Sequence, residues 1–142
     1  MNLSEFELFC KTYRFKKYSN IIKDTNNEVR FDRIKDNINE KHGWVCLWVE
    51  KTNSDYEDYE IVYVGTAGRT ISQRCREYEN RFRHSTTGKN YAERIRNGIA
   101  DNKRYYLYIR KSDVAPVLDK ADIPQCCVEK IAFIQKLSPG WN

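Results

Sequence analysis

The sequence has no run of about 18 consecutive apolar residues, so no segment has the length and composition of a transmembrane helix. Its first residues, Met-Asn-Leu-Ser-Glu-Phe-Glu, contain neither the basic region nor the apolar core of a secretory signal peptide. Internal repeats and low-complexity segments are also absent. From these absences we expect a cytoplasmic protein that does not engage a membrane.

Cysteine and histidine are too few and too scattered for a disulfide framework or a zinc site. The five cysteines are Cys10, Cys46, Cys75, Cys126 and Cys127. Their number is odd, and no Cys-x-x-Cys spacing brings two of them together. The only histidines, His42 and His84, are remote from any cysteine pair. We therefore expect Cys126 and Cys127 to be buried apolar residues and not metal ligands.

The composition is that of a single globular domain, with 142 residues, 32% charged and 40% hydrophobic. The net charge of +5 is unevenly distributed. Residues 69–111 contain twelve Lys or Arg against four Asp or Glu, whereas residues 50–60 contain one Lys against five acids. The basic stretch also carries six aromatic residues, a mixture that suits a nucleic-acid backbone. A solvated pair of charged helices is the alternative interpretation.

Residues 1–40 are polar and charged, with Leu3, Phe6, Phe9 and Tyr13 at helical spacing. A turn-like Asp24-Thr25-Asn26-Asn27 follows. We interpret residues 1–40 as an N-terminal extension of one or two helices or strands, which serves oligomerisation or DNA contact.

The rest of the chain, residues 41–142, has the pattern of an α+β domain. Apolar runs at residues 44–49 and 59–64 predict an antiparallel hairpin around a polar loop at residues 51–58. Residues 104–110 predict a third strand. We therefore expect a small three-stranded antiparallel sheet flanked by helices, in the order β-β-α-α-β-α.

Three helices are expected in this domain. Ile71, Cys75, Tyr78 and Phe82 recur at the spacing of one helical face. Residues 85–88 should stop that helix, and Asn90 with Glu93 should open the next as a capping box, which runs to Ala100. Pro124 suits the first turn of the last helix, which residues 138–140 should end.

An ordered set of residues then becomes informative. Val62-Tyr63-Val64-Gly65 ends the second expected strand, and Arg74 lies in the first turn of the following helix. Glu129 lies on the last helix, and Pro139-Gly140-Trp141-Asn142 closes the chain. Over residues 43–142 this set resembles the GIY-YIG nucleases. The interval from Glu129 to Asn142 and the Pro-x-Trp-Asn ending look most similar to the small phage endonuclease II branch.

The resemblance implies a metal-dependent endonuclease that hydrolyses phosphodiester bonds of duplex DNA, of the restriction or phage type. It implies Mg²⁺, for which Mn²⁺ can substitute, with Glu129 as the carboxylate ligand. By the same analogy Tyr63 positions or deprotonates the attacking water, and Arg74 clamps the phosphate. Tyr78 follows Arg74 by one helical turn and so lies on its side of the helix, where it would hold the phosphate or the water.

Further contacts with DNA are expected from exposed polar residues around this set. These residues are Arg69, Arg76, Arg81, Lys89 and Asn142. The chain departs from the family pattern at two positions: Cys46 stands where the first signature places a tyrosine, and Thr66 stands where a lysine is usual. Arg69, or a lysine elsewhere in the chain, is a candidate to compensate for the second departure.

Two alternative functions stay open at this stage. The two departures are compatible with a catalytically degenerate module that only binds nucleic acid, and the fold is compatible with a protein-interaction domain. Retention of Tyr63, Arg74, Glu129 and Asn142 together favours the nuclease, because a binding module has no need of a lone carboxylate beside a basic groove. A homo-oligomer is compatible with duplex cleavage, since one active site handles one strand.

Overall fold

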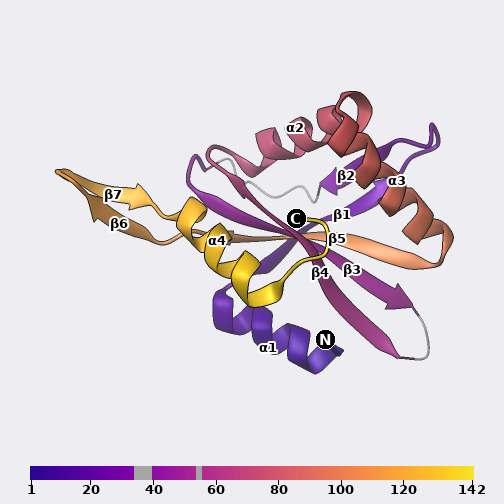
Figure 1. Cartoon of the computed structure of the whole chain (residues 1–142), viewed down its shortest axis with the longest axis horizontal. Coiled ribbons are helices and arrows are strands. Elements are labelled where there is room, and N and C mark those ends of the chain that lie inside the picture. The colour runs from indigo at the N-terminus through magenta and orange to yellow at the C-terminus, as the bar shows by residue number, and fades with distance from the viewer. Residues whose placement is uncertain (34–39, 54–55) are drawn as a thin grey trace.

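The computed structural model describes residues 1–33, 40–53 and 56–142 (Figure 1). A helix and two strands precede the expected domain: α1 (Leu3–Tyr13), β1 (Lys16–Lys23) and β2 (Val29–Arg33). The elements that follow are β3 (Trp44–Asn53), β4 (Glu57–Ala67), α2 (Ile71–His84), α3 (Thr86–Ala100), β5 (Lys103–Lys111), β6 (Val114–Val117), β7 (Lys120–Pro124) and α4 (Cys126–Leu137). The order predicted for residues 41–142 is confirmed, with one additional hairpin, β6–β7.

The main sheet has five antiparallel strands in the order β2-β1-β5-β3-β4, so the predicted three-stranded sheet is wrong in size. The extension supplies the difference, because β1 pairs with β5 and β2 pairs with β1. Without β1, the edge of β5 would leave a row of backbone donors and acceptors unpaired. Strands β1 and β2 therefore share one sheet with the rest of the chain; the role of residues 1–40 in oligomerisation or DNA contact stays a prediction.

Helices cover both faces of the sheet (Figure 1). Helices α2 and α3 lie against one face, over a core that includes Phe31, Trp48 and Leu107. Helices α1 and α4 lie against the other, over a core that includes Val45 and Leu47. No helix in the described ranges is long and apolar enough to span a membrane.

A bulge in β4 decides which residues face α2 and α3. Trp48 is paired with Tyr63, but the next residue of β3, Val49, is paired with Ile61, so Val62 is the extra residue. As a result Val62 and Tyr63 both belong to the core under α2 and α3. The bulge thereby places the tyrosine of the Tyr-x-Gly element beside Trp48.

Helix α2 matches its prediction. Its buried residues include all four at the predicted spacing, and the hydroxyl of Thr70 accepts a hydrogen bond from the Gln73 amide at its start. Helix α3 begins earlier than predicted, because Ser85, and not Asn90, is its N-cap. The Ser85 hydroxyl accepts from the Gly88 amide at 2.9 Å. Gly88 is required there because a Cβ would overlap the carbonyl of Arg81.

The remaining differences lie at loops and at the cysteines. The predicted loop at residues 51–58 is mostly strand: β3 continues to Asn53 and β4 begins at Glu57, while residues 54–55 lie outside the described ranges. Pro124 ends β7 and does not begin α4. Cys126 is buried as predicted, but Cys127 is exposed, because it points away from the sheet on α4.

Candidate active site

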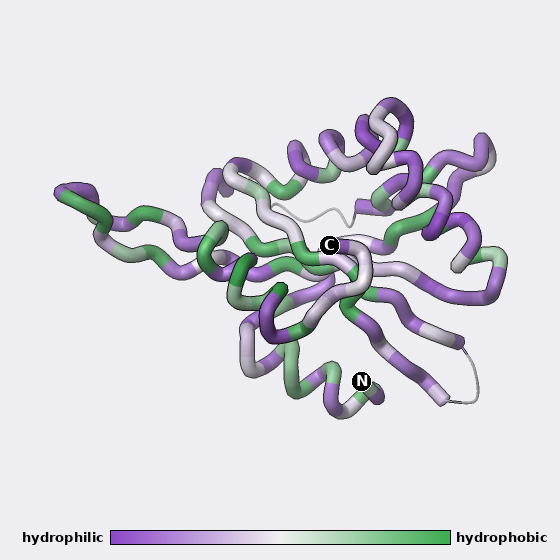
Figure 2. The backbone as a smooth tube through the Cα atoms, viewed as in Figure 1, coloured by the Kyte–Doolittle hydropathy of each residue, from purple (hydrophilic) through white to green (hydrophobic). Residues whose placement is uncertain are grey.

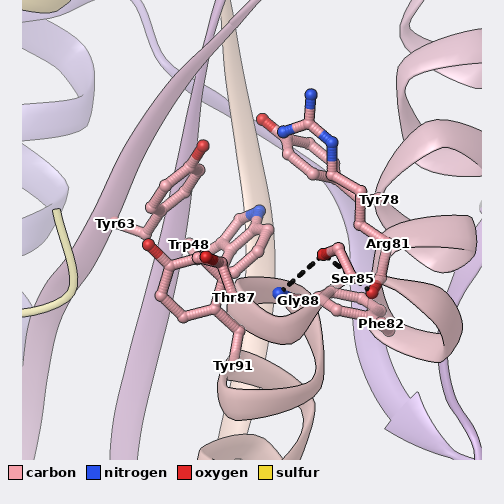
Figure 3. A pocket seen from close by; sticks show the side chains of 9 residues that line it. All are labelled: Trp48, Tyr63, Tyr78, Arg81, Phe82, Ser85, Thr87, Gly88 and Tyr91. Atoms are coloured by element: carbon pink, nitrogen blue, oxygen red, sulfur yellow. Dashed lines mark hydrogen bonds between the residues drawn. The ribbon is translucent and has the colours of Figure 1, made fainter.

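A pocket of about 320 Å³ opens on the α2 and α3 side of the sheet (Figure 3). Its walls come from β3, β4, α2 and α3, and are mainly aromatic. The lining residues are Trp48, Tyr63, Tyr78, Arg81, Phe82, Ser85, Thr87, Gly88 and Tyr91. Both predicted catalytic tyrosines, Tyr63 and Tyr78, thus share one pocket with Arg81, one of the predicted DNA-contacting arginines.

Tyr63 is held by its neighbours on both sides. Its ring centroid lies 4.2 Å from that of Trp48 and 5.6 Å from that of Tyr91. Tyr78 meets it edge-on at 6.1 Å. Figure 3 shows the hydroxyl groups of Tyr63 and Tyr78 on the same side of the pocket. The packing therefore fixes two phenols, from a strand and a helix, with a common orientation.

Gly65 allows this arrangement, which explains the glycine of the Tyr-x-Gly element. A Cβ at this position would overlap the hydroxyl of Tyr78 and would lie 2.8 Å from Cε1 of Tyr63. The helix can approach β4 this closely only because residue 65 has no side chain.

We therefore expect Gly65→Ala to lower the free energy of unfolding by about 1–3 kcal/mol, because the two tyrosines must move apart. Thermal unfolding followed by circular dichroism measures the effect. Gly68→Ala is the matched control, since a Cβ there meets nothing within 4 Å. Equal melting temperatures for the two variants would contradict the packing role of Gly65.

Arg74 lies against the same group of residues. Its guanidinium carbon is 4.4 Å from the ring centroid of Tyr78, and its Nη1 donates to Oε2 of Glu77 at 2.7 Å. The side chain is largely buried, at 17% exposure. Arg74, Tyr63 and Tyr78 are therefore brought together as the sequence predicted, with their catalytic roles still to be tested.

Three buried hydrogen-bonding groups in this region have no partner among the described residues. They are the Tyr78 hydroxyl, Nε1 of Trp48 and Nε of Arg74. Leaving a buried donor unsatisfied costs about 1–3 kcal/mol, and such orphan groups are rare in native proteins. Trp48 and Tyr78 line the pocket, and Arg74 packs on the ring of Tyr78.

Burial also fixes the protonation state of Tyr78. Desolvation raises the pKa of its hydroxyl well above the ordinary value; Cys46 and Tyr63 add to this rise, and the nearby Arg74 opposes it. At neutral pH the group is therefore a neutral phenol, able to donate a hydrogen bond but unsuited to act as a base. Burial likewise raises the pKa of the Cys46 thiol, so this group is also uncharged at neutral pH.

Glu129 lies in a different group of contacts, at the start of α4. Its Oε1 accepts from Nε of Arg110 at 3.1 Å, and its Oε2 accepts from the amide of Asp113 at 2.8 Å. Arg110 is itself buried and also donates to the carbonyl of Tyr13 at 2.9 Å. The structure thus does not bring Glu129 into contact with Tyr63, Arg74 or Tyr78, and its role as a metal ligand stays a prediction.

Mg²⁺ prefers oxygen ligands in octahedral geometry. The described residues contain no group of three or more His, Cys, Asp or Glu side chains that could hold a metal ion. Magnesium, however, is commonly held by one carboxylate together with water and substrate phosphate. Each oxygen of Glu129 accepts one hydrogen bond and keeps a further acceptor site, and such bonds orient ligating carboxylates. Glu129 therefore fits a magnesium ligand of this sparse type.

The predicted DNA-contacting cations are distributed over α2, α3 and the loop before α2. Arg69, Arg76, Arg81 and Lys89 are exposed, and within the described part of the chain none of them forms an ion pair. Arg69 and Arg74 also line a second, shallow pocket of about 190 Å³ at the start of α2, together with Thr66. These positive charges are therefore free for an anionic partner.

Asn142 has a structural role that the sequence did not reveal. Its side-chain amide donates to the Val64 carbonyl at 2.8 Å and accepts from the Val64 amide at 2.7 Å. The Trp141 amide donates to the Val62 carbonyl, so the tail pairs with the edge of β4. The Trp141 carbonyl accepts from the Tyr91 hydroxyl at 2.7 Å. The tail thus braces the pocket from outside; contact between Asn142 and DNA stays a prediction.

Trp48, Tyr91 and Arg110 are site residues that the sequence interpretation did not single out. Trp48 lies in an unbroken apolar run, where alternation cannot tell one face from the other. Tyr91 follows Gly88 by three residues on α3, which places the two residues on the same side of the helix. This spacing was the signal in the sequence that could have located Tyr91 at the pocket. Arg110 was counted only as one more basic residue.

Comparisons with known proteins give a likeness of fold. No protein-family model matches the chain, and no curated protein sequence matches it. Among solved structures, a mutant of bacteriophage T4 EndoII superposes with a TM-score of 0.68 and 17% identity, covering 96% of this chain and 97% of that one. The restriction endonuclease HPY188I, in complex with product DNA, gives a TM-score of 0.49 and 15% identity, covering 97% and 82%.

Proposed function

We propose that this protein is a DNA endonuclease that hydrolyses phosphodiester bonds of duplex DNA. The observation that carries the proposal is the pocket that Tyr63 and Tyr78 share, with Arg74 packed on the ring of Tyr78 and exposed cations on the neighbouring helices. A phosphate group would accept hydrogen bonds from the Arg74 guanidinium and the Tyr78 hydroxyl. The GIY-YIG-like order of residues and the fold shared with the phage EndoII support the same activity.

Arg74 and the two tyrosines of the pocket have complementary tasks in such a reaction. Arg74 presents a guanidinium fork, which neutralises the developing charge on phosphoryl oxygens and holds them in two directions. Tyr78 donates a hydrogen bond as a neutral phenol. Tyr63 positions the attacking water, since its hydroxyl lies on the same side of the pocket as the hydroxyl of Tyr78 (Figure 3).

Glu129 would hold Mg²⁺, for which Mn²⁺ can substitute. When bound, the ion supplies Lewis-acid stabilisation of the charge that develops on the phosphate and on the leaving oxygen. Arg110 and the Asp113 amide fix the direction of the carboxylate. This orientation is the contribution of the protein to the site, whatever ion is used.

Supercoiled plasmid incubated with the full chain, with Mg²⁺ or with EDTA, tests the proposal. We expect nicked or linear product with Mg²⁺ and none with EDTA. The runner-up is a catalytically degenerate binding module, which the buried, neutral Cys46 at the position of the first-signature tyrosine favours. Retarded but uncut plasmid under both conditions would establish that module and refute the endonuclease.

Binding should depend steeply on salt if Arg69, Arg76, Arg81 and Lys89 contact phosphates. We expect the logarithm of the association constant to fall with the logarithm of salt concentration, with a slope of about −0.9 per contact. Arg76→Gln should reduce the magnitude of the slope by about one and weaken all sequences alike. Lys136→Gln, on α4, is the control that should leave it unchanged. A slope near zero for the wild type would point to a protein-interaction domain.

A further inference from the structure

Helix α2 carries two acidic residues, Glu77 and Glu79, among four arginines. Figure 2 shows the hydrophilic colour along most of this helix. Glu79 is 14% exposed and accepts a hydrogen bond from the Arg33 guanidinium, so it fastens α2 to strand β2. Glu77 is 48% exposed and pairs with Arg74, on its own helix. The packing of α2 on the sheet therefore accounts for Glu79 and not for Glu77.

Glu77 and Tyr78 hold the guanidinium of Arg74 on two sides. They follow Arg74 by three and four residues, so all three side chains lie on one side of the helix. The carboxylate accepts from Nη1 at 2.7 Å, and the ring centroid of Tyr78 lies 4.4 Å from the guanidinium carbon. A guanidinium has further donors on its fork, which a phosphate can take while Glu77 keeps its contact. The pair thus leaves Arg74 aimed and still able to bind an anion.

Glu77 also lies at the space in which such an anion would bind. Glu77 and Arg74 both line the shallow pocket of about 190 Å³ at the start of α2, together with Arg69 and Thr66. A phosphate in that pocket would be attracted by the two arginines and repelled by the carboxylate. Glu77 would therefore oppose the binding of DNA while it directs the side chain that holds the phosphate.

Helix stability does not explain the pair. An ion pair with a half-exposed partner contributes little to the free energy of unfolding. On a helix the favourable order places the acid before the base, because the carboxylate then lies nearer the positive end of the helix dipole. Here Arg74 precedes Glu77, which is the less stabilising order. The contact is therefore better explained by its effect on Arg74 than by its effect on α2.

We propose that Glu77 is a positioning residue, which fixes the guanidinium of Arg74 for the transition state and weakens the binding of DNA. The inference rests on the proposed endonuclease activity, in which Arg74 holds the phosphate. A donor that is already aimed stabilises the developing charge without reorganising during the reaction. Repulsion acts on the phosphate before and during the reaction alike, so it lowers affinity and leaves the rate at saturating DNA unchanged. Positioning and repulsion are therefore separable by experiment.

Two substitutions separate these effects, because Glu77→Gln removes the charge and keeps an oxygen acceptor, whereas Glu77→Ala removes both. Electrophoretic retardation in EDTA measures DNA affinity, and single-turnover cleavage at saturating DNA with Mg²⁺ measures the rate. Both variants should bind DNA about threefold more tightly than the wild type at low salt, because a negative charge near the phosphate is gone. Glu77→Gln should keep the rate within about threefold of the wild type, whereas Glu77→Ala should lose about 10–10²-fold.

Glu7→Gln is the matched control. Glu7 is exposed on α1, which packs on the other face of the sheet. Its replacement raises the net charge by one, as Glu77→Gln does, so a general charge effect would appear in both variants. Glu7→Gln should leave affinity and rate near those of the wild type. Thermal unfolding should show that all three variants are nearly as stable as the wild type, since exposed charges contribute little.

A Glu77→Ala variant that cleaves at the wild-type rate would overturn the proposal and leave the endonuclease standing. Equal losses of rate in Glu77→Gln and Glu77→Ala, without tighter binding in either, would also overturn it and assign the contact to the structure of α2. A wild type that does not cleave plasmid would refute the proposed function itself, and the positioning role with it.

Discussion

Glu129→Gln should reduce plasmid cleavage by about 10³-fold or more while leaving DNA affinity near that of the wild type. A bound metal ion contributes several kcal/mol of transition-state stabilisation, and each 1.36 kcal/mol is a factor of ten in rate. Glutamine retains an acceptor for Arg110 but has no negative charge for the ion. Single-turnover cleavage and an electrophoretic binding assay measure the two effects separately.

The ion pair with Arg110 requires a control, because Glu129 also has a structural task. Its loss leaves the buried Arg110 without its nearest carboxylate, which should lower the free energy of unfolding by about 1–3 kcal/mol. Asp113→Asn removes the other, exposed carboxylate near Arg110, and an exposed pair contributes at most about 1 kcal/mol. Cleavage should therefore stay within about threefold of wild type in Asp113→Asn. Equal losses in both variants would assign the effect to Arg110 and not to a metal ligand.

The parts of the fold that were predicted correctly depend on local signals. The four buried positions of α2 follow helical spacing, and the hydroxyl of Thr70 caps the helix at the expected start. The β3–β4 hairpin follows from two apolar runs separated by a polar segment. Such patterns are visible in a single sequence because the residues that cooperate are close along the chain.

The parts that were missed depend on distant pairing or on a single residue. The place of β1 is decided by β5, more than 80 residues later in the chain. The bulge at Val62 changes which face of the sheet the β4 side chains beyond it point to, but it leaves the apolar pattern of the sequence unchanged. The tail pairs with β4 through the side chain of Asn142, and no secondary-structure pattern in the sequence predicts this contact. The hairpin β6–β7 lacks an alternating pattern because no core covers it.

The candidate site also combines local contacts, which were predictable from the sequence, with distant contacts, which were not. Arg74 and Tyr78 are one helical turn apart, so their proximity was predictable, and the Tyr-x-Gly element located Tyr63. The three-dimensional neighbours of Glu129 were not predictable, because Arg110 reaches it from β5 and the Asp113 amide from the start of the hairpin. A family pattern gives the order of residues along the chain, whereas contacts across the sheet require coordinates.

The two tyrosines of the pocket can be separated by removing one hydroxyl at a time. Tyr63→Phe should reduce cleavage by about 10²–10⁴-fold if this hydroxyl positions or activates the water. Its ring contacts with Trp48 and Tyr91 persist, so the free energy of unfolding should change by no more than about 1 kcal/mol. Cleavage rates and thermal unfolding of the same preparation measure both quantities.

Tyr78→Phe is the matched comparison, because it deletes a buried hydroxyl that has no partner in the described structure. That deletion should leave stability unchanged or raise it by about 1 kcal/mol, since an unsatisfied buried group is removed. If Tyr78 donates to the phosphate, cleavage should still fall, and affinity for DNA should fall with it. Tyr63→Phe should instead retain affinity, because a water-positioning hydroxyl acts after the DNA is bound. Normal cleavage by a stable Tyr63→Phe protein would exclude its hydroxyl from the reaction and leave Tyr78 as the phenol to examine.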